Sequence, residues 1–170
     1  MPAQDDHSVR GFIWLAFWLL LLGFTVYMFQ TWIDKERNPN ANPITSSSGD
    51  VRQVVLKRNR QGHYVTTGTI NGTPLEFLLD TGATDISIPE HVAEKIGLKK
   101  LYPIKIYTAN GIAEAYGTKI NSASIGKIVL RDLKAHINPN VEDDTVLLGM
   151  SFLKRIEFTQ RGDTLILKQY

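Results

Sequence analysis

An aspartate that directly ends an apolar run is the residue of this chain best placed to do chemistry. Residues 77–84 read Phe-Leu-Leu-Asp-Thr-Gly-Ala-Thr, so Asp80 is followed at once by Thr81 and Gly82. The apolar strand would bury the base of the loop and hold the carboxylate rigidly, while Gly82 permits a close backbone approach or a positive φ. Thr81 offers a hydroxyl that could hold two such loops together. Because Asp and Gly also favour turns, an ordinary turn is the alternative.

Two later segments supply a context for this aspartate. Residues 146–153 read Val-Leu-Leu-Gly-Met-Ser-Phe-Leu, an apolar strand that breaks at Gly149 into a short helix-like segment. Between the two segments, residues 105–108 and 113–120 flank Ala-Asn-Gly, which predicts a β-hairpin at the position expected for a lid.

This ordered set resembles the retropepsin-like aspartic proteases, and within them the bacterial, membrane-anchored branch known from rickettsiae. The resemblance covers residues 51–170. It implies that the catalytic loop is Asp80, Thr81 and Gly82, that Leu148 and Gly149 brace it, and that a flap closes over an extended peptide. The candidate substrate contacts are Ala83, Asp85, Tyr107, Asn110, Gly111 and Ile112. For the flap residues an ordinary hairpin role stays open, and Asp85 could instead cap a turn.

Two positions depart from the viral members of that family. Those enzymes usually carry Asp where Thr84 stands and Arg where Met150 stands, and the two side chains form a charged pair near the dimer interface. Here both are uncharged. Because both charges are absent together, no unpaired charge is left buried, which would destabilise the fold. Details of subunit packing in the viral enzymes therefore do not apply to this chain.

Aspartic protease chemistry requires two carboxylates that share one proton. The chain contains a single Asp-Thr-Gly, since the other aspartates between 85 and 163 lack the following Thr/Ser-Gly. The second carboxylate must therefore come from a second copy through an isologous two-fold interface, which predicts a homodimer. The family resemblance implies that the last strand, residues 165–168, interleaves with the partner's.

An uncharged apolar run near the N-terminus predicts a membrane anchor. Residues 12–33 carry no charge, and about 20 such residues cross the hydrocarbon core of a bilayer. We expect a tail at 1–11, a transmembrane helix at 12–33, a flexible linker at 34–50 and the protease domain at 51–170. A cleaved signal peptide is the alternative, but the run is long and no A-x-A site follows it. Flanking charges do not set the orientation. The resemblance implies a single-pass protein of the bacterial inner membrane with a periplasmic domain.

Short β-rich runs alternate with turn signals throughout the domain, which predicts an all-β fold, a retropepsin-like barrel with one short helix. Expected hairpins join 65–70 to 75–79 and 155–159 to 164–168, and 125–130 and 133–137 read as separate strands. The helix would begin at Pro89 and stop at Gly97.

Composition limits the other possibilities. The chain has no cysteine and its four histidines show no ligand spacing, so we expect no metal and no cofactor. A net charge of +2 with scattered basic residues gives no reason to expect nucleic acid as a partner. The expected function is a membrane-anchored aspartic endopeptidase acting on peptides or proteins. A catalytically silent module for membrane-tethered peptide binding or dimerisation is the alternative, and an unrelated β-barrel peptide-binding domain is a more remote one. The sequence does not reveal the substrate.

Overall fold

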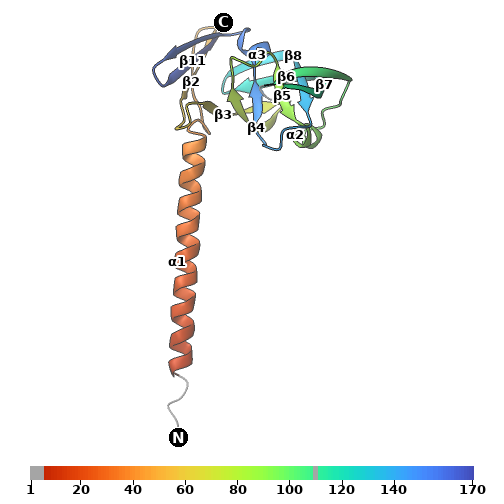
Figure 1. The fold of residues 1–170 in the computed structure, drawn as a ribbon. Coiled ribbons are helices and arrows are strands. Elements are labelled where there is room, and N and C mark those ends of the chain that lie inside the picture. The colour runs from red at the N-terminus through yellow and green to blue at the C-terminus, as the bar shows by residue number, and fades with distance from the viewer. Residues whose placement is uncertain (1–5, 109–110) are drawn as a thin grey trace. The chain divides into compact units, whose positions relative to one another are not determined.

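The chain divides into two compact units, an N-terminal helix and a folded domain (Figure 1). The computed structural model describes residues 6–108 and 111–170, with side chains described from Val9 onward. The first unit ends at Glu36, and the second is Arg37–Tyr170. Helix α1 (Asp6–Arg37) accounts for the described part of the first unit.

Helix α1 exposes its apolar side chains along its length. The segment Val9–Arg37 is long and apolar enough to cross a membrane, and none of its most apolar window is buried inside the protein. Its large side chains, such as Leu20 at 75% and Phe12 at 72% exposure, have no protein core to enter. A long apolar helix near the N-terminus fits either a membrane anchor or a signal sequence.

The described residues of the domain form eleven strands and two short helices. In chain order these are β1 (Ile44–Ser48), β2 (Val51–Lys57), β3 (Tyr64–Ile70), β4 (Thr73–Leu79), β5 (Ile86–Pro89), α2 (Glu90–Lys95), β6 (Tyr102–Thr108), β7 (Gly111–Ile125), β8 (Ile128–Asn138), β9 (Val146–Leu148), α3 (Met150–Leu153), β10 (Glu157–Arg161) and β11 (Thr164–Gln169). The domain is therefore a β fold with two helical turns rather than one, because the chain continues from Gly149 into α3.

The larger sheet has seven strands in the order β3-β4-β9-β5-β8-β7-β6. A further pairing joins β3, at one end, to β7, which is next to the other end. Strand β9 pairs in parallel with β4, which places 146–148 beside 77–79. The predicted hairpin of β3 and β4 is present, with positive φ at both Asn71 and Gly72 as a primed turn requires. Strand β8 is continuous, where the sequence suggested two strands. The polar pair Arg131-Asp132 interrupts the apolar pattern of the sequence. Arg131 still pairs with Ser122 of β7, and the register is the same on both sides of Asp132, whose φ is positive.

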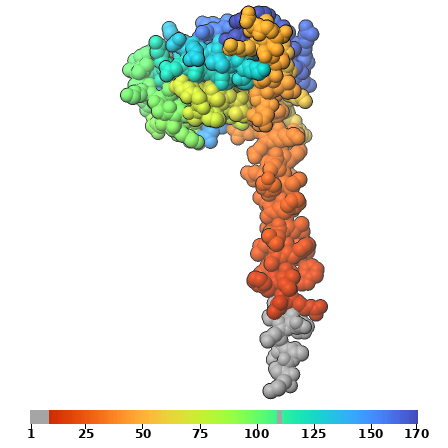
Figure 2. Space-filling model, turned by 180° about the vertical axis from the view of Figure 1, so that it is seen from behind, coloured from red at the N-terminus to blue at the C-terminus, as the bar shows by residue number. Residues whose placement is uncertain are grey.

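The smaller sheet has four strands in the order β1-β2-β11-β10 and unites the two ends of the domain. The last strand, β11, lies between β2 and β10 of its own chain, so it does not need a partner's strand to complete its pairing. The interleaving with a partner's strand that the family resemblance implied stays a prediction. Figure 2 shows the early and late segments of the domain meeting on one face. Val54, Leu56, Leu165 and Leu167 turn inward and join the main core.

Most of the segment expected to be a flexible linker is folded into the domain. Asn40 is buried, and its side-chain amide donates to the carbonyl oxygens of Lys57 (2.8 Å) and Val65 (2.7 Å). Its Oδ1 accepts from the backbone N–H of Lys57 at 2.7 Å, and Asn38 donates to Glu76 at 3.1 Å. The structure thus begins the compact unit at Arg37 and not near 51. The Asn40 side chain thereby satisfies backbone groups of Lys57 and Val65.

We predict that stability falls in mild acid because of His136. This side chain is buried on β8, and burial lowers its pKa from the ordinary 6.5, while the carboxylate of Asp85 opposes that effect. As the pH falls below the ordinary histidine pKa of 6.5, His136 of the unfolded chain binds a proton that the folded chain does not yet bind. The free energy of unfolding therefore decreases. The circular-dichroism melting midpoint should drop between about pH 7.5 and pH 5.5, and His136→Gln should reduce the drop. The exposed His63, changed to Gln, is the control. An equal drop in wild type and His136→Gln would contradict this origin.

Candidate active site

Asp80 stands at the point where β4 leaves the larger sheet. The buried Phe77 anchors the strand, and β9 flanks its last three residues. The backbone N–H of Asp80 donates to the carbonyl of Leu148 at 3.1 Å, so the pairing continues to the aspartate itself. Its Oδ1 accepts from the backbone N–H of Gly82 at 2.8 Å. The carboxylate is held in place at one oxygen and is only partly buried.

The turn after β9 supports this loop through its backbone. Met150 donates its N–H to the carbonyl of Ala83 (2.8 Å), and Ser151 donates its N–H to that of Thr84 (2.8 Å). Gly149 is buried between them, and a Cβ there would lie 2.4 Å from the carbonyl oxygen of Asp85 and 2.6 Å from that of Ala83. No side chain fits in that space, which is the physical reason for a glycine at this position.

These contacts bear on the two uncharged positions. The segments that contain Thr84 and Met150 are joined by backbone hydrogen bonds, from Met150 to Ala83 and from Ser151 to Thr84. No charged side-chain pair is needed to hold them together. Met150 packs half-buried against the core, and the side chain of Thr84 is exposed.

Sequence reasoning missed Ser151. Its hydroxyl accepts from the backbone N–H of Ile86 at 3.1 Å and donates to the carbonyl of Lys134 at 3.4 Å. The hydroxyl therefore links the backbone that follows the Asp-Thr-Gly loop to α3 and β8. Its place in the Gly-Met-Ser run was a weak signal, because a serine there also fits a solvent-exposed helix start.

The predicted flap is a hairpin of β6 and β7. Tyr107 lies directly opposite Ile112, and Thr108 opposite Gly111. The Tyr107 and Ile112 side chains share one face near the hairpin end and are 87% and 64% exposed. Asn110 lies outside the described residues. The structure thus brings Asp80, Thr81, Gly82 and Ala83 together with Leu148 and Gly149, and it places Tyr107, Gly111 and Ile112 on a separate hairpin.

Asp85, which follows the loop, is partly buried, and its negative charge favours the protonated form of His136.

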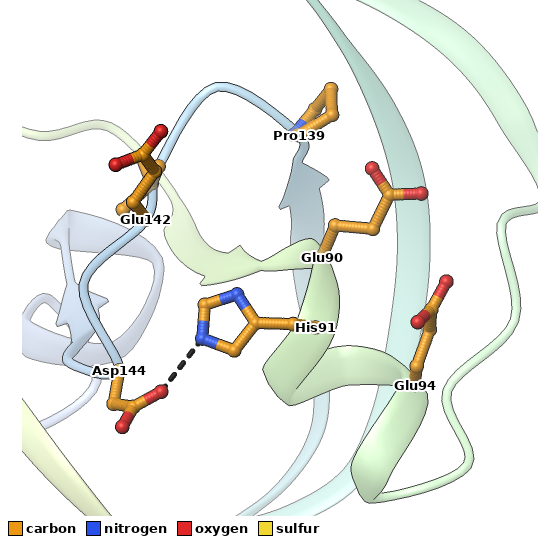
Figure 3. A pocket seen from close by; sticks show the side chains of 7 residues that line it. Glu90, His91, Glu94, Pro139, Glu142 and Asp144 are labelled. Carbon is orange, nitrogen blue, oxygen red and sulfur yellow. Dashed lines mark hydrogen bonds and ion pairs between the residues drawn. The ribbon is translucent and has the colours of Figure 1, made fainter.

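A separate pocket has mostly acidic side chains, which Figure 3 shows. It is lined by Glu90, His91, Glu94, Pro139, Val141, Glu142 and Asp144. His91 Nε2 lies 2.7 Å from Asp144 Oδ1. Within the described chain no three His, Asp or Glu side chains are grouped to hold a metal ion.

Comparison with known proteins places this chain in a family. Residues 66–155 match the family model described as "gag-polyprotein putative aspartyl protease". An uncharacterised Sinorhizobium protein is 37% identical over 166 residues, which cover 92% of this chain and 71% of that protein. An uncharacterised Rickettsia prowazekii protein is 31% identical over 160 residues, covering 91% and 68%. The crystal structure of a retropepsin-like aspartic protease from Rickettsia conorii superimposes with a TM-score of 0.59 at 34% identity, covering 75% of this chain and 95% of that one.

The chain belongs to this family of retropepsin-like aspartic proteases. The matched region runs from the buried Thr66 on β3 to Arg155 after α3, and so includes both the Asp-Thr-Gly loop and its brace.

We predict that Gly149→Ala damages the site. The added methyl group would meet two backbone carbonyls of the catalytic loop, and neither can move without displacing that loop. We expect a loss of about 1–3 kcal/mol in unfolding free energy, the usual cost of overpacking, together with loss of peptide cleavage. Gly23→Ala in α1 is the matched control, because nothing lies within 4 Å of its added Cβ. Unchanged melting and cleavage in Gly149→Ala would show that the brace is not tight.

Proposed function

We propose that the chain is a membrane-anchored aspartic endopeptidase whose active site combines Asp80 from two copies. The observation that carries the proposal is the position of Asp80, partly exposed at the tip of a braced loop with one oxygen held by Gly82. No other aspartate of the chain stands in an Asp-Thr-Gly sequence. Each chain therefore supplies one of the two carboxylates, and a homodimer would supply both.

The chemistry follows from the proximity of two like charges. Two facing carboxylates cannot both ionise cheaply, so the pair holds one proton between them. The ionised carboxylate takes a proton from a water molecule, whose oxygen attacks the carbonyl carbon of the scissile bond. The protonated carboxyl donates its proton to the carbonyl oxygen, giving a tetrahedral diol. When the C–N bond breaks, the carboxyl that took the water's proton passes it to the leaving nitrogen.

The hairpin of β6 and β7 is proposed to cover an extended peptide. Tyr107 and Ile112 present paired apolar side chains on one face of its end, where they could contact substrate side chains. Residues 83 and 85, beside the catalytic aspartate, would meet the peptide backbone. An extended peptide offers unpaired N–H and C=O groups to such a hairpin, which supports this class of substrate.

The helix is proposed to anchor the enzyme in the bacterial inner membrane, with residues 12–33 as the spanning segment and the domain in the periplasm. The exposed apolar surface of α1 supports an anchor, because a bilayer would cover it. The relatives found are bacterial, from Sinorhizobium and Rickettsia. Two chains anchored in one membrane also meet more often than free chains do.

We predict that Asp80→Asn abolishes cleavage and leaves the fold intact. Asn is close to Asp in shape, and its amide oxygen can still accept from Gly82. Cleavage of a diverse peptide library should fall by about a thousandfold or more, in keeping with the loss of an acid–base group. The control is Asp50→Asn, an exposed turn residue outside the site. Cleavage by Asp80→Asn at the wild-type rate would exclude the mechanism. An inactive wild type that still dimerises would favour the silent binding module.

We predict that a periplasm-dependent reporter enzyme fused after Tyr170 is active and stays in the membrane fraction. Alkaline washing removes peripheral proteins but does not release a spanning apolar helix, because hydrophobic burial does not depend on charge. Release of the full-length fusion into the wash would contradict the anchor. Activity confined to a cytoplasmic reporter would reverse the proposed orientation.

A further inference from the structure

Strand β9 carries the brace to the Asp80 loop, yet short sheet pairing holds this strand. It has three residues, pairs in parallel with β4 at those three positions, and pairs with β5 at the single position Leu147. Gly149 follows directly and fits against the loop with no room for a side chain. A small shift of β9 along β4 would therefore pull the brace away from the loop. The position of Asp80 thus depends on what fixes the start of β9.

The side chain of Arg37 joins the starts of these two strands. Its Nη2 atom lies 3.2 Å from Oε1 of Glu76 on β4. The same atom lies 3.1 Å from Oδ1 of Asp143 and 3.1 Å from Oγ1 of Thr145, the residue just before β9. The Thr145 hydroxyl is itself 3.3 Å from Oε1 of Glu76. One guanidinium nitrogen therefore contacts both β4 and the segment that leads into β9.

This contact lies at the opposite end of the strand pair from the brace. The register of β4 and β9 begins with Phe77 beside Val146, so Glu76 and Thr145 stand one position before it. Glu76 and Asp80 are four residues apart, which is about 13 Å along a strand, and they share one face of β4. The two strands are thus held by Arg37 at one end and by backbone hydrogen bonds of the brace at the other.

The backbone around Arg37 is also held in place. Its carbonyl accepts from the side-chain amide of Asn59 at 3.0 Å. The next residue, Asn38, is buried and donates to Thr67 at 3.3 Å and to Glu76 at 3.1 Å. Arg37 is both the last residue of α1 and the first residue of the folded unit. The segment that connects the apolar helix to the domain therefore also binds to β4.

The ion pair stays charged in mild acid. Burial would raise the pKa of Asp143, but hydrogen bonds from Thr145 and the positive charge of Arg37 outweigh burial, so the pKa lies below the ordinary 3.8. The guanidinium does not lose its proton in proteins. The contact therefore persists at a mildly acidic pH, where two facing carboxylates readily share one proton.

We propose that Arg37 is a positioning residue for Asp80, and that it fixes the start of β9 beside β4. This rests on the proposed function, because the position of Asp80 affects cleavage only if Asp80 acts on the substrate. A single exposed ion pair contributes little to stability. The effect of Arg37 is therefore expected in the rate of the chemical step more than in the melting midpoint.

Kinetics of full-length Arg37→Ala in detergent test the proposal. Its kcat should fall about tenfold or more, because a small misplacement of a reacting group slows the reaction strongly. Its KM should change little, because the hairpin proposed to cover the substrate is unaltered.

Arg58→Ala is the matched control. The Arg58 side chain is 42% exposed against 51% for Arg37, and it too has a carboxylate partner, Asp163 at 3.7 Å. Asp163 and the carbonyl of Gly62, which Arg58 also binds, belong to other segments than β4 and β9. Arg58→Ala should keep the wild-type kcat, with an equally small change in melting midpoint. Equal kcat in the two variants, or a loss confined to KM, would overturn the proposal.

A double variant shows whether Arg37 acts through β4. Glu76→Gln keeps the shape of the side chain and removes its charge, so kcat should fall in the same direction. Arg37→Ala combined with Glu76→Gln should be no slower than Arg37→Ala alone, because both changes remove one contact. Losses that multiply in the double variant would show that the two residues act separately, contrary to the proposal.

Hydrogen exchange gives a readout that does not need cleavage. In Arg37→Ala the amides of residues 77–83 and 146–151, which include the brace donors Asp80 and Met150, should exchange severalfold faster. Amides of β7 and β8 should keep their wild-type rates, and Arg58→Ala should change neither group. Faster exchange spread equally over the domain would indicate general destabilisation and would contradict a positioning role.

The outcomes separate positioning from chemistry. Locally faster exchange in Arg37→Ala together with full cleavage by Asp80→Asn would retain the positioning contact and remove the proposed function. Loss of cleavage in Asp80→Asn with wild-type kcat and exchange in Arg37→Ala would do the reverse.

Discussion

Close backbone contact between the Asp-Thr-Gly loop and the turn after β9 is the constraint on which the site depends. The parallel pairing of β4 with β9 brings the ends of these two strands side by side. Backbone hydrogen bonds from Asp80 to Leu148 and from Met150 to Ala83 then join the two segments that follow. The contact is possible because Gly149 has no side chain. Charge plays no part in it. The loop can therefore be rigid although Thr84 and Met150 lack the ion pair of viral relatives, and a rigid loop is what preorganises a catalytic carboxylate.

Under the proposed function the same loop supplies half of a site, so that assembly of two chains is part of the chemistry. The small sheet bears on how the halves meet, because β11 already fills the position between β2 and β10 in its own chain. Each domain can therefore fold with its terminal strands paired before it meets a partner. Under the same proposal, two membrane anchors would raise the local concentration of the chains, so even a weak dimer could form.

Local signals in the sequence predicted much of this. The Asn71-Gly72 hairpin, the short helix α2 and the Asp80 loop each follow from neighbouring residues. Features that depend on distant partners could not be predicted. Asn40 lies in a segment with the composition of a linker, yet its amide bonds to groups on β2 and β3. The hydroxyl of Ser151 matters because Ile86 lies next to it in space and not in sequence. The pairing of β11 within its own chain is a choice of partner, which strand pattern alone cannot make.

Mixing wild-type chains with a growing excess of Asp80→Asn chains tests the shared site most directly. Subunit exchange would be followed independently with two distinguishable tags. If each active site needs Asp80 from both chains, cleavage per wild-type chain falls in proportion to the wild-type fraction once exchange is complete. If exchange is complete and cleavage per wild-type chain stays constant, each chain works alone, and the shared carboxylate pair is wrong.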